Sequence, residues 1–231
     1  LAIPLRYRMN DSTQLRGIFF YGKLEDNWIG HQFVDIYHDG LYRTFLPLIK
    51  EGTLAIDIGA NIGLVSMHLS HYFERVIALE PSLEHFDALN RNLQVNKITN
   101  VKPIRKAIYI RDGEFPFGGP EDNKTMRSLH VATWPNGKNS EMVEAITLDK
   151  LFEEEKIEKV DFLKRDVEGT ETEIISSEGF KKVAPKIQVI LGETHNWSGR
   201  HPNQLKDALR MNGFAVSGMT HDPEVFIGRM E

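Results

Sequence analysis

From residue 54 onward, short continuous apolar runs alternate along the chain with stretches whose apolar residues follow helical spacing. The runs Leu54–Ile58 and Arg75–Leu79 are typical of strands that are buried on both faces of a parallel sheet. A helix is expected between them at Leu64–Tyr72, and the apolar positions after Ser82 fall on one helical face. This alternation predicts an α/β fold whose mostly parallel sheet is covered by helices on both faces.

The same alternation continues toward the C-terminus. Ser82 stands where it would cap the helix after the second strand. Thr170 and Glu173 have capping-box spacing ahead of another helix, and Pro202 and Gly213 frame a further one. More strands are predicted at residues 101–110, 142–148, 160–164 and 187–191, with a closing strand pair at 214–219 and 225–227.

Two stretches fall outside this regular alternation. Residues 1–24 hold short β-like pieces, and residues 28–49 are aromatic with helical spacing. We therefore divide the chain into an N-terminal cap segment at residues 1–50, packed on the core, and one domain at residues 51–231. Residues 112–138 are rich in Gly, Pro, Asn and charge, which predicts a hairpin or a mobile insertion.

The composition narrows the class of protein. A length of 231 residues with 41% hydrophobic content suits one domain with a full core and excludes a disordered chain. A net charge of −5 excludes a general electrostatic attraction to nucleic acid. The absence of cysteine excludes disulfides, thiolate metal sites and cysteine nucleophiles. No stretch is apolar enough to span a membrane, and Leu1–Met9 lack the core of a signal peptide. A cytoplasmic location is therefore expected, and a homo-oligomer is allowed.

The turn after the first predicted core strand carries the pattern Asp57-x-Gly59-x-Asn61-x-Gly63. Glycines in such a turn let backbone N–H groups approach a ligand, and the following helix adds its positive N-terminal end. Dinucleotide-binding turns instead read G-x-G-x-x-G and receive a diphosphate, which the Asp57 carboxylate would repel. S-adenosylmethionine brings an ammonium group to this position, and an acid is a suitable partner for it. The pattern therefore favours S-adenosylmethionine over NAD as the ligand.

Polar residues also follow the other predicted strands. Glu80 ends the second strand, where a carboxylate can accept hydrogen bonds from both hydroxyls of a ribose. Asp166 and Glu168 follow the strand at 160–164, and Glu193 and His195 follow the strand at 187–191. Because ligands of open α/β sheets bind outside the carboxyl ends of the strands, we expect these side chains to surround one site.

Methyl transfer to an alcohol benefits from a group that takes the hydroxyl proton. His195, Asp166 and Glu168 are the candidates, and the unperturbed pKa of histidine suits the role best. Each also has a purely structural interpretation. His195 could be a strand-end histidine bonded to backbone, Asp166 a turn cap, and Glu168 a carboxylate stabilised near a helix N-terminus. With Glu193 they could offer oxygen and imidazole ligands to a divalent metal such as Mg²⁺ or Mn²⁺, but their spacing does not demand a metal and no metal ligand is assigned. Lys164, inside an apolar run, needs an acidic partner.

Four segments together resemble the FkbM family of S-adenosylmethionine-dependent methyltransferases. They are residues 55–63 (AIDIGANIG), residues 78–81 (ALEP) followed by Leu89, Asn90 and Asn92, residues 146–149 (ITLD), and residues 162–169 (FLKRDVEG). The glycine turn marks only the broad class I methyltransferase fold, whereas the last segment is far more specific.

The resemblance implies a Rossmann-like, seven-stranded sheet with the last strand antiparallel. It also implies methylation of a hydroxyl oxygen on a sugar, a glycan or a natural-product small molecule, with S-adenosylmethionine as the cofactor. The expected cofactor-binding residues are Asp57, Gly59, Ala60, Asn61, Gly63, Glu80, Pro81 and Asp166, and the expected catalytic residues are Asp166, Glu168 and His195.

Two positions depart from the family pattern. Arg165 stands where an apolar residue is usual, and the sequence at residues 106–108 lacks the acid that often holds adenine, which leaves that role to backbone or to Asp112. Three other functions stay open: an RNA methyltransferase, a cofactor-binding protein without catalysis and a nicotinamide oxidoreductase. The lack of a basic RNA-binding module argues against the first, and Asp57 argues against the last.

Overall fold

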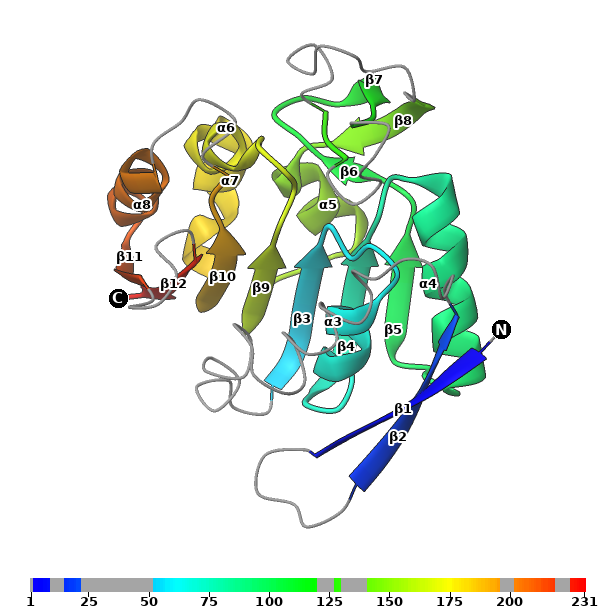
Figure 1. The fold of residues 1–231 in the computed structure, drawn as a ribbon. Coiled ribbons are helices and arrows are strands. Elements are labelled where there is room, and N and C mark those ends of the chain that lie inside the picture. The colour runs from blue at the N-terminus through cyan, green and yellow to red at the C-terminus, as the bar shows by residue number, and fades with distance from the viewer. Residues whose placement is uncertain are drawn as a thin grey trace.

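The structure is a computed structural model that describes the backbone of residues 2–8 and 15–21 and the chain at residues 52–119, 127–129, 141–195, 202–218 and 225–231. The helical segment expected at residues 28–49 and most of the insertion expected at 112–138 lie outside the described residues. The strands β1 (Ala2–Arg8) and β2 (Leu15–Tyr21) pair as an antiparallel hairpin, and β2 contacts the helix α4 (Leu83–Val95) (Figure 1). The division of the chain at residue 50 stays a prediction.

A seven-stranded sheet forms the centre of the molecule (Figure 1). Its strands lie in the order β11 (Phe214–Gly218), β12 (Val225–Met230), β10 (Val189–Glu193), β9 (Phe162–Arg165), β3 (Gly52–Ile58), β4 (Phe73–Leu79) and β5 (Val101–Ile104). Neighbours from β10 to β5 run parallel, whereas β12 runs antiparallel to both β10 and β11. The sheet is therefore the mostly parallel one with an antiparallel last strand that was expected, and this prediction is confirmed.

The register of the central strands brings the expected site residues to one edge of the sheet. Ile58, the last residue of β3, pairs with Leu79 at the end of β4 and with Arg165 at the end of β9. The residues that follow these three strands therefore emerge side by side. The chain leaves β3 for β4 on one side and returns to β9 on the other, so the strand order switches at this point, where open α/β sheets bind their ligands.

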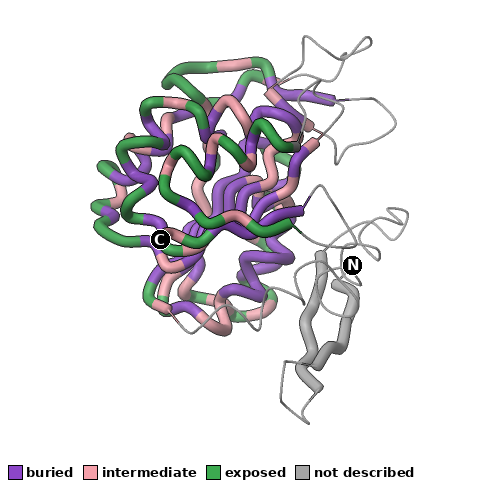
Figure 2. Tube along the Cα trace, turned by 90° about the vertical axis from the view of Figure 1, so that its left-hand side faces the viewer, coloured by how far each residue is buried: buried purple, intermediate pink, exposed green. Residues whose placement is uncertain are grey.

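Helices cover both faces of the sheet, and each face has its own apolar core. On one face α3 (Leu64–Leu69) and α4 pack on a cluster that includes Ala55 and Phe162. The other face is covered by α5 (Leu148–Glu154), α6 (Glu171–Ser176), α7 (Glu178–Val183) and α8 (Pro202–Met211). Figure 2 shows the buried strands between these outer layers. No helix among the described residues has the length and apolar character to cross a membrane.

A separate three-stranded sheet corrects the prediction of one strand at residues 101–110. β5 ends at Ile104, and after a turn the short strand β6 (Ala107–Ile108) pairs with β8 (Glu141–Ile146) instead of extending the main sheet. β7 (Gly113–Phe117) pairs with β8 from the other side, so the expected hairpin begins where the insertion was placed. In Figure 1 this small sheet stands above the carboxyl ends of β4 and β5.

Two helix caps expected from the sequence are not formed as expected. Ser82 occupies the N-cap position of α4, but its hydroxyl makes no capping bond and accepts a hydrogen bond from Arg127 at 2.6 Å. Thr170 occupies the N-cap position of α6 without a side-chain capping bond. The carboxylate of Glu171 accepts the N–H of Gly169 at 2.9 Å there instead. The first turn of α6 is thus built around Glu171.

Candidate active site

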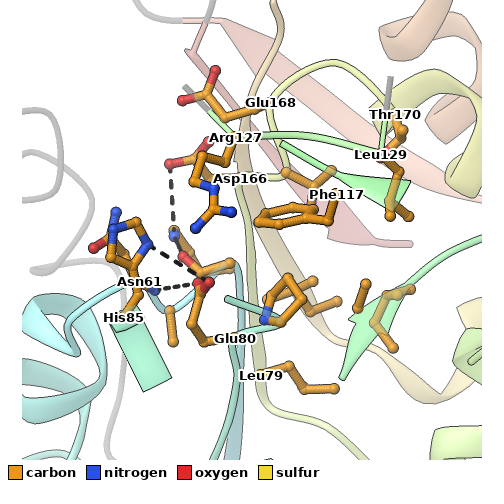
Figure 3. A pocket seen from close by; sticks show the side chains of 18 of the residues that line it. Asn61, Leu79, Glu80, His85, Phe117, Arg127, Leu129, Asp166, Glu168 and Thr170 are labelled. Carbon is orange, nitrogen blue, oxygen red and sulfur yellow. Dashed lines mark hydrogen bonds and ion pairs between the residues drawn. The ribbon is translucent and has the colours of Figure 1, made fainter. Parts of the chain in front are cut away.

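A cavity of about 330 Å³ opens at the carboxyl ends of β3, β4, β9 and β10, between the main sheet and the small sheet. Figure 3 shows Glu80 and Asp166 facing this space, with Phe117 and Arg127 beside them. Of the predicted site residues, Gly59, Ala60, Asn61, Glu80, Pro81, Asp166 and Glu168 line the cavity. The sequence argument therefore placed most of these side chains at one edge of the sheet correctly, while their roles stay predictions.

The glycine turn is needed because the chain passes very close to its neighbours. Gly59 has φ +77, and a Cβ at this position would lie 1.8 Å from the backbone oxygen of Asp166. Gly63 has φ +92, and a Cβ there would lie 2.4 Å from a methyl group of Leu89. Gly63 is not among the residues that line the cavity. No side chain larger than hydrogen fits at Gly59 without moving the strand end that carries Asp166.

The backbone N–H groups of the turn are used within the fold, which differs from the expectation that they would reach a ligand. The N–H groups of Gly59 and Ala60 both donate to the oxygen of Leu79, at 3.0 and 2.9 Å. The N–H of Asn61 donates to Oε2 of Glu80 at 2.9 Å. The turn therefore fixes the shape of the cavity and the position of Glu80.

Asp57 lies behind the turn and is fully buried, so it does not form part of the cavity wall. Its Oδ2 accepts a hydrogen bond from Ser66 at 2.6 Å, and its Oδ1 lies 3.3 Å from Nζ of Lys164. The expected direct contact between Asp57 and a cofactor is thus not supported by its position. The leading acid of the motif instead holds the helix and the lysine that surround the turn.

Lys164 connects the glycine turn to the acid of the next strand end. Its Nζ donates to the oxygen of Gly59 at 2.9 Å and lies 3.7 Å from Oδ2 of Asp166. Burial alone would lower the pKa of Lys164, but the charges of Asp57 and Asp166 outweigh burial and raise it. The lysine is therefore charged, and the prediction that it has an acidic partner is confirmed.

Glu80 is a nearly buried carboxylate held from two sides. Oε2 accepts the N–H of Asn61 and Oε1 accepts the N–H of Ser82, both at 2.9 Å. His85 also lines the cavity, with Nδ1 3.8 Å from Oε1 of Glu80 (Figure 3). A carboxylate with fixed orientation at the cavity wall is suited to hydrogen-bond a pair of hydroxyl groups.

The three predicted catalytic residues come together from two strand ends. Nε2 of His195, just after β10, lies 3.3 Å from Oε2 of Glu168 and 3.7 Å from Oδ1 of Asp166, both just after β9. Nδ1 of the same ring lies 2.8 Å from Oε1 of Glu171. Glu168 has φ +55, a left-handed conformation unusual for glutamate, and Gly169 follows with φ +110. This turn places the Glu168 carboxylate beside His195.

The charges of this cluster argue against His195 as a general base at neutral pH. Burial would lower the pKa of His195, but the hydrogen bond to Glu171 and the charges of Asp166 and Glu168 raise it to about 10. Burial and the charge of Asp166 raise the pKa of Glu168 well above its usual range. The unperturbed pKa on which the base role of His195 was predicted therefore does not hold, because the sequence analysis did not anticipate the hydrogen bond of Glu171 to this ring.

The far wall of the cavity comes from the small sheet and the insertion at residues 112–138, where the sequence analysis named no individual site residue other than Asp112. Arg127 lies 5.3 Å over the ring of Phe117, donates to Ser82 and pairs with Glu141 at 2.9 Å. The sequence signal for this wall was only the polar composition of the insertion. Asp112, which the sequence analysis left as a partner for adenine, is not among the lining residues. Its carboxylate instead accepts the N–H of Thr147 and forms an ion pair with Lys150 of α5, both at 2.9 Å.

One group among the described residues has the donor set of a metal site. One ligand atom each from Asp166, Glu168 and His195 lies within 4.8 Å of the others. Glu193 lines the cavity but is not part of this group. The sequence analysis offered Asp166, Glu168, Glu193 and His195 as possible metal ligands without assigning a metal. The fold brings all of these except Glu193 into one group.

The family model of the FkbM methyltransferase domain matches residues 57–215 of this chain. The chain belongs to the FkbM methyltransferase family. It is 25% identical to the methyltransferase sdnD of Sordaria araneosa over 84% of each chain. It is 26% identical to the hexuronic acid methyltransferase AglP of Haloferax volcanii, over 82% of this chain and 75% of that one. It is 24% identical to the 31-O-demethyl-FK506 methyltransferase FkbM of Streptomyces tacrolimicus, over 79% of this chain and 80% of that one.

Solved structures agree on the fold of this FkbM-family chain. An FkbM methyltransferase from Methylobacillus flagellatus superposes with a TM-score of 0.57 at 15% identity, covering 82% of this chain and 46% of that chain. The fibrillarin pre-rRNA processing protein of Methanococcus jannaschii superposes with a TM-score of 0.51 at 13% identity, covering 100% of this chain and 89% of that one. At these identities the likeness shows the fold alone.

Proposed function

We propose that this FkbM-family methyltransferase uses S-adenosylmethionine to methylate a hydroxyl group of a sugar, a glycan or a natural-product small molecule. The observation that carries the proposal is the pair of carboxylates that line the cavity on either side of the glycine turn, Glu80 and Asp166. When bound, S-adenosylmethionine supplies a methyl group on a positively charged sulfur.

The residues present fit this cofactor. Glu80, oriented by two backbone N–H groups, would hold the ribose hydroxyls, and the apolar wall at Leu79, Pro81 and Ile108 would hold the adenine ring. Asp166 would hold the ammonium group, while Asp57 acts through Lys164 and Ser66. Gly59 keeps this part of the cavity open, since a Cβ there would meet the chain at Asp166.

A diphosphate is a poor match for the same cavity. Glu80, Asp166, Glu168 and Glu193 all line it, and carboxylates repel phosphate at short range. This argues against a nicotinamide dinucleotide and against the phosphate backbone of RNA, in agreement with the net charge of −5. The sequence relatives include a hexuronic acid methyltransferase and a 31-O-demethyl-FK506 methyltransferase, which supports a carbohydrate or natural-product acceptor.

The acidic wall also selects among acceptor groups. Asp166 accepts hydrogen bonds, so it would bind and orient a neutral hydroxyl, whereas an acceptor carboxylate would be repelled. An alcohol is therefore favoured over an acid as the methyl acceptor.

Calorimetry of the purified chain tests the cofactor. S-adenosylmethionine and S-adenosylhomocysteine are expected to bind at one site, and NADH is expected to give no heat. Uptake of NADH with no response to either sulfur compound would overturn the assignment.

Transfer of a radiolabelled methyl group to glycans and polyhydroxylated small molecules tests the acceptor. The label is expected to survive mild base, because an ether is stable where a methyl ester releases methanol. Base-labile label would assign a carboxylate acceptor instead, and tight cofactor binding without transfer to any hydroxyl compound would leave a binding protein without catalysis.

A further inference from the structure

We propose that Asp166, Glu168 and His195 bind a divalent metal ion, Mn²⁺ or Mg²⁺, and that acceptor hydroxyl oxygens complete its coordination. The second half of this statement rests on the proposed function, whereas metal binding by the three side chains does not. The inference assigns a direct chemical partner to the cluster at the ends of β9 and β10.

The separations of the three ligand atoms fit one small ion. Nε2 of His195 lies 3.3 Å from Oε2 of Glu168 and 3.7 Å from Oδ1 of Asp166. With metal–ligand bonds of about 2.1 Å, adjacent ligands of an octahedral ion lie about 3 Å apart and opposite ones about 4.2 Å apart. The observed separations fall between these two values, so a cation needs only small side-chain movements.

The imidazole is oriented as in metal sites. Nδ1 of His195 contacts the nearly buried Glu171 at 2.8 Å, and Glu171 is fixed by the N–H of Gly169. Histidines that bind metals usually give their other ring nitrogen to a carboxylate, which fixes the tautomer and orients the metal-binding nitrogen. Here that nitrogen, Nε2, is aimed at Asp166 and Glu168.

The two carboxylate oxygens that face Nε2 have no hydrogen-bond donor among the described residues. They are Oδ1 of Asp166 and Oε2 of Glu168, and both atoms are buried. Buried carboxylate oxygens are normally hydrogen-bonded or bound to a metal. Two such oxygens that converge on one imidazole nitrogen are an independent sign of a cation site.

The ligand types indicate which ion binds. Two carboxylates and one imidazole, with no cysteine in the chain, suit a hard or borderline cation such as Mn²⁺ or Mg²⁺. Three protein ligands leave positions of an octahedron free for water or for acceptor oxygens. Because Asp166 and Glu168 line the cavity, those positions face the space in which the acceptor would lie. A hydroxyl bound to the cation would release its proton to solvent water more readily than a free alcohol.

Electron paramagnetic resonance of Mn²⁺ tests the site directly. The full chain is treated with chelator, kept free of cofactor and titrated with MnCl₂, and one saturable site that MgCl₂ competes for is expected. Glu168→Gln should weaken Mn²⁺ binding at least tenfold. Glu155→Gln is the matched control, because it removes one carboxylate that pairs with Arg75 and Lys102 away from the cavity and should leave the Mn²⁺ affinity unchanged.

A second variant, His195→Gln, guards against a folding defect in the first, and circular dichroism verifies that each variant is folded. Absence of saturable Mn²⁺ binding, or binding unchanged in both folded variants, would overturn the metal site. Calorimetry with S-adenosylhomocysteine in chelator separates this result from a failure of the proposed function, because cofactor binding needs no metal. Methyl transfer should stop with chelator and return with Mn²⁺, and transfer that is indifferent to chelator would overturn the acceptor role of the ion.

Discussion

On the cavity wall formed by β3 and β4, the Glu80 carboxylate is hydrogen-bonded by backbone N–H groups, whereas on the wall formed by β9 and β10 Asp166 and Glu168 are gathered around His195. On the first wall both carboxylate oxygens of Glu80 have hydrogen-bond donors, which fix the orientation of the side chain. The second concentrates negative charge that protein groups only partly balance. The difference teaches that one wall holds its carboxylate in a fixed orientation, while the other carries the uncompensated charge on which the proposed cation site rests.

Removing the link between the two walls should have the largest effect. Lys164→Met would leave Asp57 buried without its cation and release the oxygen of Gly59, so a loss of roughly 3–5 kcal/mol in the free energy of unfolding is expected. Urea denaturation measures it. Lys182→Met removes an exposed lysine paired with Asp149 and should change stability little. Equal stability of Lys164→Met and the unaltered protein would show that the walls are independent.

Closing the gap at the turn should come next. Gly59→Ala places a Cβ against the backbone of Asp166 at a positive φ, so about 3 kcal/mol of stability should be lost and cofactor binding should fall. Gly113→Ala is the control, because φ there is also positive but the Cβ meets only the Phe115 ring at 3.4 Å. A thermal melt compares the two variants. A milder effect at Gly59 than at Gly113 would contradict the close approach.

Loss of the oriented acid should affect binding more than folding. Glu80→Ala removes a charged hydrogen-bond acceptor at the cavity wall, so the affinity for S-adenosylhomocysteine should fall by about 1–3 kcal/mol. Calorimetry measures this change. The same measurement on Glu168→Gln sharpens the comparison, since that change on the other wall should lower turnover while leaving most of the affinity. Equal losses of affinity would mean that both walls hold the cofactor.

The helix after the turn should make stability depend on pH. Burial, aided by the charge of His71, lowers the pKa of His68 in α3 to about 3, so the unfolded state binds a proton between about pH 6.5 and pH 3 that the folded state does not. Stability is full above the unfolded pKa and falls with acidification by up to about 1.4 kcal/mol per pH unit. Urea titrations at pH 7 and pH 5 should show a smaller difference for His68→Leu than for His71→Leu.

The comparison of the walls also explains how much the sequence could predict. Apolar runs and the Asp57-to-Gly63 turn carry their information locally, so the mostly parallel sheet and the placement of Glu80 at its edge followed from the pattern. The pKa of His195 depends on three carboxylates from the segment between β9 and the first turn of α6, which periodicity cannot bring to the end of β10. Each local motif was therefore predictable, and the electrostatics of their meeting point was not.

The errors in the fold have the same origin. The strand expected at 101–110 breaks after Ile104 because β6 finds a hydrogen-bonding partner in β8, far along the chain. Ser82 has the right residue type for a cap, yet its hydroxyl accepts from Arg127 across the cavity. Asp57 was expected to hold the cofactor and lies beneath the cavity, since Ser66 and Lys164 offer it buried partners. In each case a distant partner overrides a local preference.

The position of β12 has a consequence for biogenesis. This strand follows β11 and joins it to β10, so in a nascent polypeptide that ends near Gly218 the edges of β10 and β11 are not yet paired by β12. Exposed edges of this kind recruit other chains. The cavity wall formed by β3 and β4 needs only residues that were translated earlier, so it is able to fold at that stage. The rate at which β12 inserts between β10 and β11 would then set how long these edges stay exposed to other chains.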